Sequence, residues 1–237
     1  MIPIYQKKIE YGMCDTNAQL KLPEILKMVE AGIASFFGIY HKDNPTIKKE
    51  YSALWLFTKT KVVINRLPLW DEVVQISARR VFLDSKLSVI VEVYIHSVHE
   101  TEGIYAWVEC CTASIETRKL LRLTAIDFQI PIQGPCPVSF QKWNEELSYL
   151  RSITISSSYI DYSRHVNNAE YLRLLLDCFT IEELEKISCK GFEIHYLKEA
   201  KEEDVLEIQY KKINDCRYFT IKRELPILEV RMEENRI

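Results

Sequence analysis

Residues 22–39 read LPEILKMVEAGIASFFGI, and the apolar positions of this stretch recur at intervals of three and four residues. Ile25, Leu26, Val29 and Ile33 therefore share one face of a helix, whose first turn tolerates the proline at its second position. The pattern predicts an amphipathic helix over the whole stretch. Because such a helix cannot bury its apolar side alone, neighbouring elements must cover that side.

Four segments that follow the helix are rich in Val, Ile, Thr and aromatic residues and are separated by turn-like stretches, a pattern that predicts successive antiparallel strands. These segments are Leu54 to Asn65, Val73 to Val81, Leu87 to Val98 and Ile104 to Ile115. One helix ahead of a run of long strands indicates an α+β fold in which the sheet buries the helix.

A stretch with three prolines and a glycine, Pro131 to Pro137, interrupts this rhythm and is typical of a linker. We predict an N-terminal domain over residues 1–130, a linker over 131–147 and a C-terminal domain over 148–237. The second half repeats the plan of the first. Its predicted elements are a strand near Ile153 to Ser158, a helix from Asn168 to Ile187, and strands near Phe192 to Leu197, Val205 to Ile213 and Tyr218 to Leu225.

Two sequence matches indicate that the plan is an internal duplication. Residues 15–20, DTNAQL, and residues 161–166, DYSRHV, both precede a predicted helix, at an offset of 146 (161 minus 15). Residues 71–76, DEVVQI, resemble residues 203–208, EDVLEI, at an offset of 132 (203 minus 71). Internal repetition of this kind predicts two related structural units.

The composition argues against several classes of protein. A formal charge of -3 over 237 residues supplies no general basic field for nucleic acid. The seven cysteines are odd in number and show no C-x-x-C spacing, which favours reduced thiols over disulfides or zinc. Since no apolar stretch approaches the roughly 20 residues that span a bilayer, we expect a cytoplasmic protein that does not enter a membrane. His96 and His99 form an H-x-x-H string without a carboxylate-bearing helical motif, so no metal is expected.

The densest polar cluster lies at residues 161–172, DYSRHVNNAEYL. Asn167 or Asn168 is a candidate N-cap of the helix that follows. A helix N-terminus presents backbone N–H groups and the positive end of a dipole, which would stabilise a thioester oxyanion placed there. A purely structural interpretation, in which these residues shape a turn and cap a helix, explains the same pattern.

The sequence resembles the acyl-acyl carrier protein (ACP) thioesterase family of plants and bacteria, whose C-terminal hotdog domain carries a D-x-N-x-H-V-N-N-x-x-Y segment. Further similarity covers residues 55–76, 107–123 and 193–206, so that it touches most of the chain. The resemblance implies two tandem hotdog domains, each a long helix packed against an antiparallel sheet. The family segment stands here as Asp161, Ser163, His165, Val166, Asn167, Asn168 and Tyr171.

Carried over by position, the resemblance makes Asp161 and His165 members of the catalytic set, with Ser163 where the family has Asn. It also implies that Glu199 is the acid/base carboxylate, and Ala200 stands where the family has Cys. Because alanine has no reactive atom, water is the candidate nucleophile. Judged without the resemblance, Glu199 is typical of a solvated charge at the end of a strand.

The activity that follows is hydrolysis of a fatty acyl-ACP thioester without a cofactor. We expect Glu199 to accept a proton from the attacking water, His165 to position that water or the carboxylate, and Asp161 to orient the assembly. Asn167 and Asn168 are expected to bind the substrate at the head of the helix.

The N-terminal unit has Gln19 where the second has His165, so we expect one active centre per chain. The N-terminal domain would then supply most of the acyl pocket. Phe36 and Trp55 are candidates for its lining, although aromatic residues in such positions more often fill a core.

Two other functions stay open at this stage. An acyl-CoA thioesterase would use the same residues, and a non-catalytic protein that binds an acyl chain would fit the substitutions at Ser163 and Ala200. An acidic carrier protein would fit a basic docking surface, although such residues also occur simply as solvated strand ends. Fusion of two hotdogs makes a monomer feasible, and a homodimer also stays open. The candidate docking residues are Arg79, Arg80, Arg118, Lys119 and Arg122.

Overall fold

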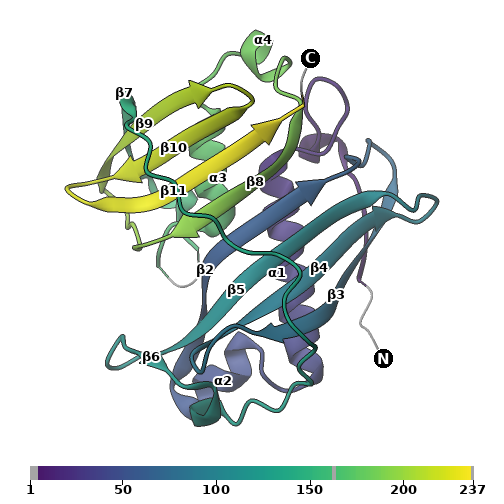
Figure 1. The fold of residues 1–237 in the computed structure, drawn as a ribbon, viewed down its shortest axis with the longest axis vertical. Helices are drawn as coiled ribbons and strands as arrows, with labels where there is room; N and C mark the ends of the chain where they lie inside the picture. Colours follow the sequence, from purple (N-terminus) through teal and green to yellow (C-terminus); the bar gives the residue numbers. More distant parts are fainter. Residues whose placement is uncertain (1–4, 162–163, 236–237) are drawn as a thin grey trace.

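The computed structural model describes residues 5–161 and 164–235. Eleven strands form one antiparallel sheet in the order β1-β3-β4-β5-β2-β8-β11-β10-β9-β7, and β6 pairs with β5 off this path (Figure 1). The strands of the first half are β1 (Tyr5–Lys8), β2 (Ala53–Ile64), β3 (Val73–Leu83), β4 (Ser88–Ser97), β5 (Gly103–Ser114) and β6 (Leu120–Leu121). Those of the second half are β7 (Ser148–Thr154), β8 (Cys189–Tyr196), β9 (Val205–Ile213), β10 (Cys216–Lys222) and β11 (Pro226–Glu234).

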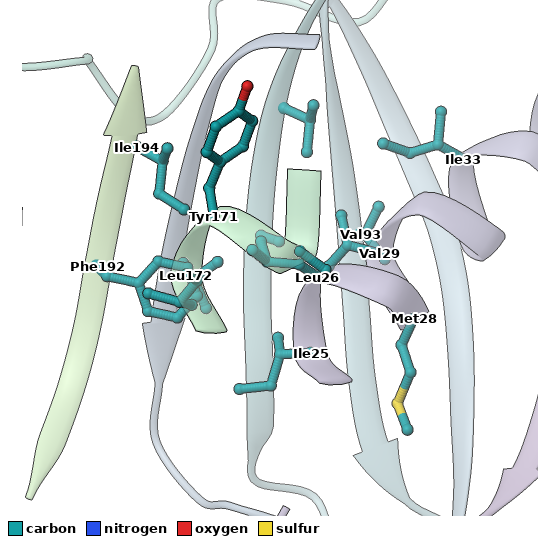
Figure 2. Packing of buried hydrophobic residues seen from close by; sticks show 14 of the residues in the cluster. Ile25, Leu26, Met28, Val29, Ile33, Val93, Tyr171, Leu172, Phe192 and Ile194 are labelled. Carbon is teal, nitrogen blue, oxygen red and sulfur yellow. The ribbon is translucent and has the colours of Figure 1, made fainter. Parts of the chain in front are cut away.

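Four α-helices accompany the sheet: α1 (Leu22–Ile39), α2 (Asn44–Tyr51), α3 (Asn168–Leu176) and α4 (Ile181–Leu184). Helices α1 and α3 pack against each other on one face of the sheet, one from each half of the chain. Their apolar faces meet the buried side of the strands, as Figure 2 shows for Leu26 and Val29 of α1, Leu172 of α3 and Phe192 and Ile194 of β8. The α+β class predicted from the sequence is therefore confirmed.

The two halves join where β2 pairs with β8, from Lys59 opposite His195 to Val63 opposite Gly191. Gly191 stands at the closest approach, where a Cβ atom would lie 2.3 Å from the carbonyl oxygen of Val62. A side chain at this position would push the two strands apart. This pairing of β2 with β8, the seam, joins the two halves in one continuous sheet. The division into domains at residues 131–147 stays a prediction.

In the first half the predicted elements agree closely with the structure. Helix α1 has the predicted bounds, and β2 to β5 each lie within one or two residues of the predicted segments. In the second half the predicted helix from Asn168 to Ile187 is wrong, because α3 ends at Leu176 and Thr180 begins α4 with a capping box to Glu183. The predicted strand near Ile153 is displaced, since β7 begins at Ser148.

The duplication is visible in the backbone hydrogen bonds before each helix. The Asp15 N–H donates to the Gln19 carbonyl at 2.8 Å, and the Asp161 N–H donates to the His165 carbonyl at 3.0 Å. Both pairs differ by the offset of 146 (161 minus 15 and 165 minus 19). The two loops therefore share this backbone hydrogen bond, although their side chains differ.

Backbone hydrogen bonds also support the second sequence match, between residues 71–76 and residues 203–208. The Ile9 N–H donates to the Glu72 carbonyl at 2.8 Å, and the Ile155 N–H donates to the Asp204 carbonyl at 2.9 Å. Glu72 and Asp204 differ by the offset of 132 (204 minus 72), as the sequence alignment requires.

Within the described residues, no helix is both long and apolar enough to cross a bilayer.

Candidate active site

The polar cluster before α3 forms a closed loop. Ile160 and Val166 form an antiparallel bridge, and Arg164 takes a positive φ of 65° to turn the chain. The Val166 N–H donates to the carbonyl oxygen of Ala200 at 3.0 Å, which ties this loop to the segment that follows β8. Two stretches distant in sequence are therefore held side by side by their backbones.

This backbone contact brings two of the predicted site residues together. The Nε2 atom of His165 lies 2.9 Å from Oε2 of Glu199. The His165 side chain is 11% exposed and that of Glu199 is 44% exposed, so the pair extends from the interior to the surface. A carboxylate that contacts both an imidazole and solvent has the position that a general base for water needs.

The head of α3 lies directly after His165. Asn167 is the N-cap, and its side-chain oxygen accepts a hydrogen bond from the Ala169 N–H at 2.9 Å. This confirms the predicted cap and leaves Asn168 as the first residue of the helix. The positive end of the α3 dipole therefore lies beside the His165–Glu199 pair.

Tyr171 of α3 contacts the backbone of the residue that follows Glu199. Its hydroxyl oxygen accepts a hydrogen bond from the Ala200 N–H at 3.0 Å. Burial raises the pKa of Tyr171 to about 12, so the phenol stays neutral. Ala200 itself is fully buried, and both its backbone groups are used, the N–H by Tyr171 and the carbonyl by Val166.

Glu30 was not predicted as a site residue, yet it lies at the same place. It belongs to α1, is half-buried, and lies near enough to Asn168 and Asn167 for both side chains to lower its pKa. Burial raises the pKa of Glu30 to about 7, and the charge of Asp161 acts in the same direction. A signal was present in the sequence: Glu30 falls four residues after Leu26, on the apolar face of α1.

Other predicted residues have different environments. Asp161 lies near enough to raise the pKa of Glu30 electrostatically. Ser163 lies outside the described residues. His195 faces the opposite side of the sheet, where its Nε2 lies 2.8 Å from Oε1 of Glu193 and its ring contacts Trp143 in a tilted arrangement, with centroids 4.7 Å apart.

Phe36 and Trp55 lie in the hydrophobic core. Trp55 stacks on Phe37 with ring centroids 4.6 Å apart, and its indole N–H donates to the Lys42 carbonyl at 2.7 Å. Phe36 is a buried residue of α1 and lies almost two turns beyond Glu30 on that helix. Their role in substrate binding stays a prediction.

The equivalent loop of the first half lacks the reactive groups. The Leu20 N–H donates to the Pro68 carbonyl at 2.9 Å, just as Val166 donates to Ala200. The residue before Pro68 is Leu67, which therefore corresponds to Glu199, and Gln19 corresponds to His165. One half of the chain has an imidazole and a carboxylate where the other has an amide and an alkyl group.

Two cavities of the structure lie elsewhere. One of about 470 Å³ opens at the seam, between Ile64 of β2 and Lys190 of β8, and one of about 80 Å³ lies between Tyr5 and Met28. Apolar side chains of α1 belong to the same buried cluster as those of the sheet. Among the described residues, no group of three or more His, Cys, Asp or Glu side chains is arranged to hold a metal ion.

The half of the chain that carries this loop has a recognisable sequence. Residues 144–234 match the acyl-ACP thioesterase C-terminal domain. This part of the chain is similar in sequence to that domain. Among curated protein sequences, none matches the chain.

Solved structures agree with this family in fold. An acyl-ACP thioesterase from Bacteroides thetaiotaomicron has a TM-score of 0.86 at 18% identity, with 99% of this chain and 98% of that chain covered. A putative oleoyl thioesterase from Lactobacillus plantarum has a TM-score of 0.82 at 18% identity, covering 100% and 98%. A 12:0-ACP thioesterase from Umbellularia californica has a TM-score of 0.82 at 12% identity, covering 99% and 97%. The predicted tandem hotdog fold is confirmed.

Proposed function

We propose that this protein is a thioesterase that releases fatty acids from acyl-ACP by water attack, with Glu199 as the general base. The observation that carries the proposal is the 2.9 Å contact between Nε2 of His165 and Oε2 of Glu199, at the head of α3. Glu199 is the partly exposed member of this pair, and water reaches an exposed carboxylate without displacing protein atoms.

In the proposed reaction Glu199 takes a proton from water as the water oxygen attacks the thioester carbonyl carbon. His165 orients the carboxylate through its contact with Oε2, and Asp161 balances the charge of the assembly. The oxyanion lies toward the N-terminus of α3, where the helix dipole stabilises it. The carbon–sulfur bond then breaks, and protonated Glu199 returns its proton to the departing thiolate, which leaves a free fatty acid and a carrier thiol.

The alternative of a covalent acyl-enzyme has no support at the neighbouring position. Ala200 stands there, fully buried and without a reactive atom. Water attack therefore accounts for turnover with the residues that are present. General base assistance contributes roughly 100- to 10,000-fold to such a reaction.

A basic turn beside the site supports an acidic carrier as the partner. Arg118 lies in the turn between β5 and β6, with Nη1 3.8 Å from Oε2 of Glu199 and a side chain that is 61% exposed. Lys119 follows directly in the same turn. The other predicted basic pair lies on β3, where Arg79 lies over the Tyr94 ring and Arg80 faces Glu92, whereas Arg118 faces Glu199 itself. We place the docking surface at the Arg118 turn.

The remaining features of the proposal concern the acyl chain and the compartment. The acyl tail would extend along α1 toward Phe36 and Trp55, so the N-terminal half would set the chain length that fits.

All seven cysteines are unpaired, which accords with a reducing cytoplasm.

Matched substrates and variants test the function. We expect the protein to hydrolyse acyl-ACP faster than acyl-CoA of the same chain, and Glu199→Gln and His165→Ala to lower kcat by at least roughly 100-fold. Glu202→Gln is the control, because Glu202 is an exposed carboxylate in the same segment. A strong preference for acyl-CoA would contradict the choice of carrier. Unchanged, barely measurable hydrolysis in every variant would indicate a protein that only binds acyl chains.

A further inference from the structure

Hydrogen bonds anchor the backbone of the segment that carries Glu199. Just before Glu199, the Lys198 N–H donates to the Ile227 carbonyl at 3.0 Å, and just after it, both backbone groups of Ala200 are bound. The carbonyl oxygen of Glu199 itself accepts a hydrogen bond from a side chain, with Nη2 of Arg223 at 3.3 Å. Arg223 therefore contacts the main chain of the residue that we propose as the general base.

Arg223 lies in the turn between β10 and β11 and uses both ends of its guanidinium group. While Nη2 donates to the carbonyl oxygen of Glu199, Nη1 donates to Oδ1 of Asp204 at 3.1 Å. Asp204 also accepts the Lys201 N–H through Oδ2 at 2.8 Å. The planar fork of a guanidinium group holds two acceptors in a fixed geometry, which a single ammonium group does not. Arg223 thus closes residues 199–204 into a loop that is held at both ends.

The equivalent segment of the first half uses its arginine differently. With the offset of 132, Leu67 corresponds to Glu199 (199 minus 67) and Glu72 to Asp204 (204 minus 72). Arg66 binds the Glu72 carboxylate with both terminal nitrogens, Nη1 to Oε2 at 2.9 Å and Nη2 to Oε1. Both halves thus pair the carboxylate at the end of the segment with an arginine. The half with the proposed base directs one nitrogen of that arginine to the carbonyl of the base instead.

This use of the second nitrogen gives Glu199 two fixed points. Nε2 of His165 lies 2.9 Å from Oε2 of the side chain, and Arg223 binds the main-chain carbonyl. The Glu199 side chain is 44% exposed, and a glutamate with that freedom has considerable rotamer entropy to lose before it can act in one orientation. Anchoring of the main chain reduces the number of positions from which the carboxylate can point.

From these contacts we infer that Arg223 is a positioning residue of the proposed active site: it holds the main chain of Glu199 so that the carboxylate stays beside His165. The inference rests on the proposed function. Placement matters, because a displacement of about 1 Å lowers a catalytic rate by up to roughly 100-fold. The side chains of Arg223 and Asp204 are 43% and 19% exposed, and ion pairs near the surface contribute little to folding. Loss of Arg223 should therefore change the rate more than the stability.

The test compares Arg223 with an arginine that makes the same kind of bond elsewhere in the second half. Arg151 of β7 is exposed and donates from Nη1 to the Asp177 carbonyl at 3.0 Å, at the end of α3. We expect Arg223→Ala to lower kcat roughly tenfold and to change KM less than about twofold. Because the base is displaced and not the carrier, the loss should be the same for acyl-ACP and for a small uncharged acyl thioester. Arg151→Ala should keep the full kcat.

Two further measurements separate positioning from folding. Guanidinium chloride at roughly millimolar concentration should restore part of kcat in Arg223→Ala, because the free ion can enter the exposed space and bind both acceptors. It should leave Arg151→Ala unchanged. Arg223→Lys keeps the charge but not the fork, so its kcat should fall between those of Arg223→Ala and the unaltered protein. The melting temperatures of Arg223→Ala and Arg151→Ala should agree.

The outcomes distinguish this inference from the proposed function. If Glu199→Gln abolishes hydrolysis while Arg223→Ala and Arg223→Lys keep the full kcat, the inference fails and the proposed function stands. A rise of KM for acyl-ACP alone would make Arg223 a carrier contact and would also refute positioning. A fall of kcat that accompanies a lower melting temperature and that guanidinium does not reverse would assign Arg223 to the fold only. If Glu199→Gln retains full activity, the proposed function fails, and the role of Arg223 fails with it.

Discussion

The N–H group of Val166 donates to the carbonyl oxygen of Ala200, with 3.0 Å between the two atoms. His165 and Glu199 each precede one of these residues, so the bond fixes the spacing of the side chains that we propose to be catalytic. The same bond in the first half, from Leu20 to Pro68, positions Gln19 and Leu67. The fold therefore supplies the geometry in both halves, and the side chains decide which half reacts.

Removal of the Tyr171 hydroxyl should loosen this geometry. In Tyr171→Phe the buried Ala200 N–H loses its acceptor, and an unsatisfied buried donor costs about 1–3 kcal/mol. We expect a loss of stability of that size in urea unfolding and a fall in kcat of roughly tenfold, since Glu199 is held less firmly. Tyr149→Phe is the control, because Tyr149 is 62% exposed. Equal behaviour of the two variants would contradict a positioning role for the Ala200 contact.

Restoration of the family cysteine should not create a nucleophile. Ala200 is fully buried, and burial in apolar surroundings raises the pKa of a thiol, so Ala200→Cys would carry a neutral, inaccessible sulfur. We expect hydrolysis to remain dependent on Glu199 and no more sensitive to iodoacetamide than in the unaltered protein. Activity that becomes labile to alkylation in Ala200→Cys would refute this expectation.

The stability of the protein should depend on pH through Glu30. Its pKa rises from an ordinary 4.5 to about 7 on folding, so the folded state binds the proton more tightly than the unfolded state. The associated stability is fully present below pH 4.5 and is lost as the pH rises through about 7. At 1.36 kcal/mol per unit, the loss is at most about 3 kcal/mol.

Glu30→Gln cannot ionise, so it should be more stable than the unaltered protein at pH 8 and gain nothing at pH 4.5. Melting temperatures measured in parallel at the two values test this, with Glu24→Gln as the surface control. A stability difference that is the same at both pH values would mean that ionisation of Glu30 is not its source.

Charge reversal at Arg118 should weaken recognition of the carrier. Because Arg118 is exposed beside Glu199, we expect Arg118→Glu to lower kcat/KM for acyl-ACP roughly tenfold at low salt, with a smaller effect at high salt. Hydrolysis of a small uncharged acyl thioester should depend less on salt, because it reports only the effect of the new charge on Glu199, 3.8 Å from the native guanidinium. Arg79→Glu provides the matched control, since Arg79 lies on β3 over Tyr94. If the Arg79 variant shows the larger loss, the carrier docks on the other basic pair.

Local patterns accounted for much of the fold. The period of apolar residues gave the bounds of α1, and β-branched runs located β2 to β5, because these signals arise within one element. The error in the second half has a local origin too. Thr180 and Glu183 form a capping box that starts a new helix, a signal that the apolar run through Leu184 obscured. Strand β11 was missed, although Leu228, Val230 and Met232 alternate as buried residues along it.

By itself, the sequence determined the repeat and a cap at Asn167 or Asn168, because each depends on residue types at fixed spacing along the chain. His165 and Glu199 became candidates through the resemblance to a known family. Only the tertiary structure decided which side chains from the other half meet them. Helix α1 packs on α3, and Arg118 lies 3.8 Å from Glu199 because the β5–β6 turn ends beside the second loop. The physical reason is that such contacts depend on the pairing of β2 with β8 and on helix packing, which join residues without any regular separation in sequence.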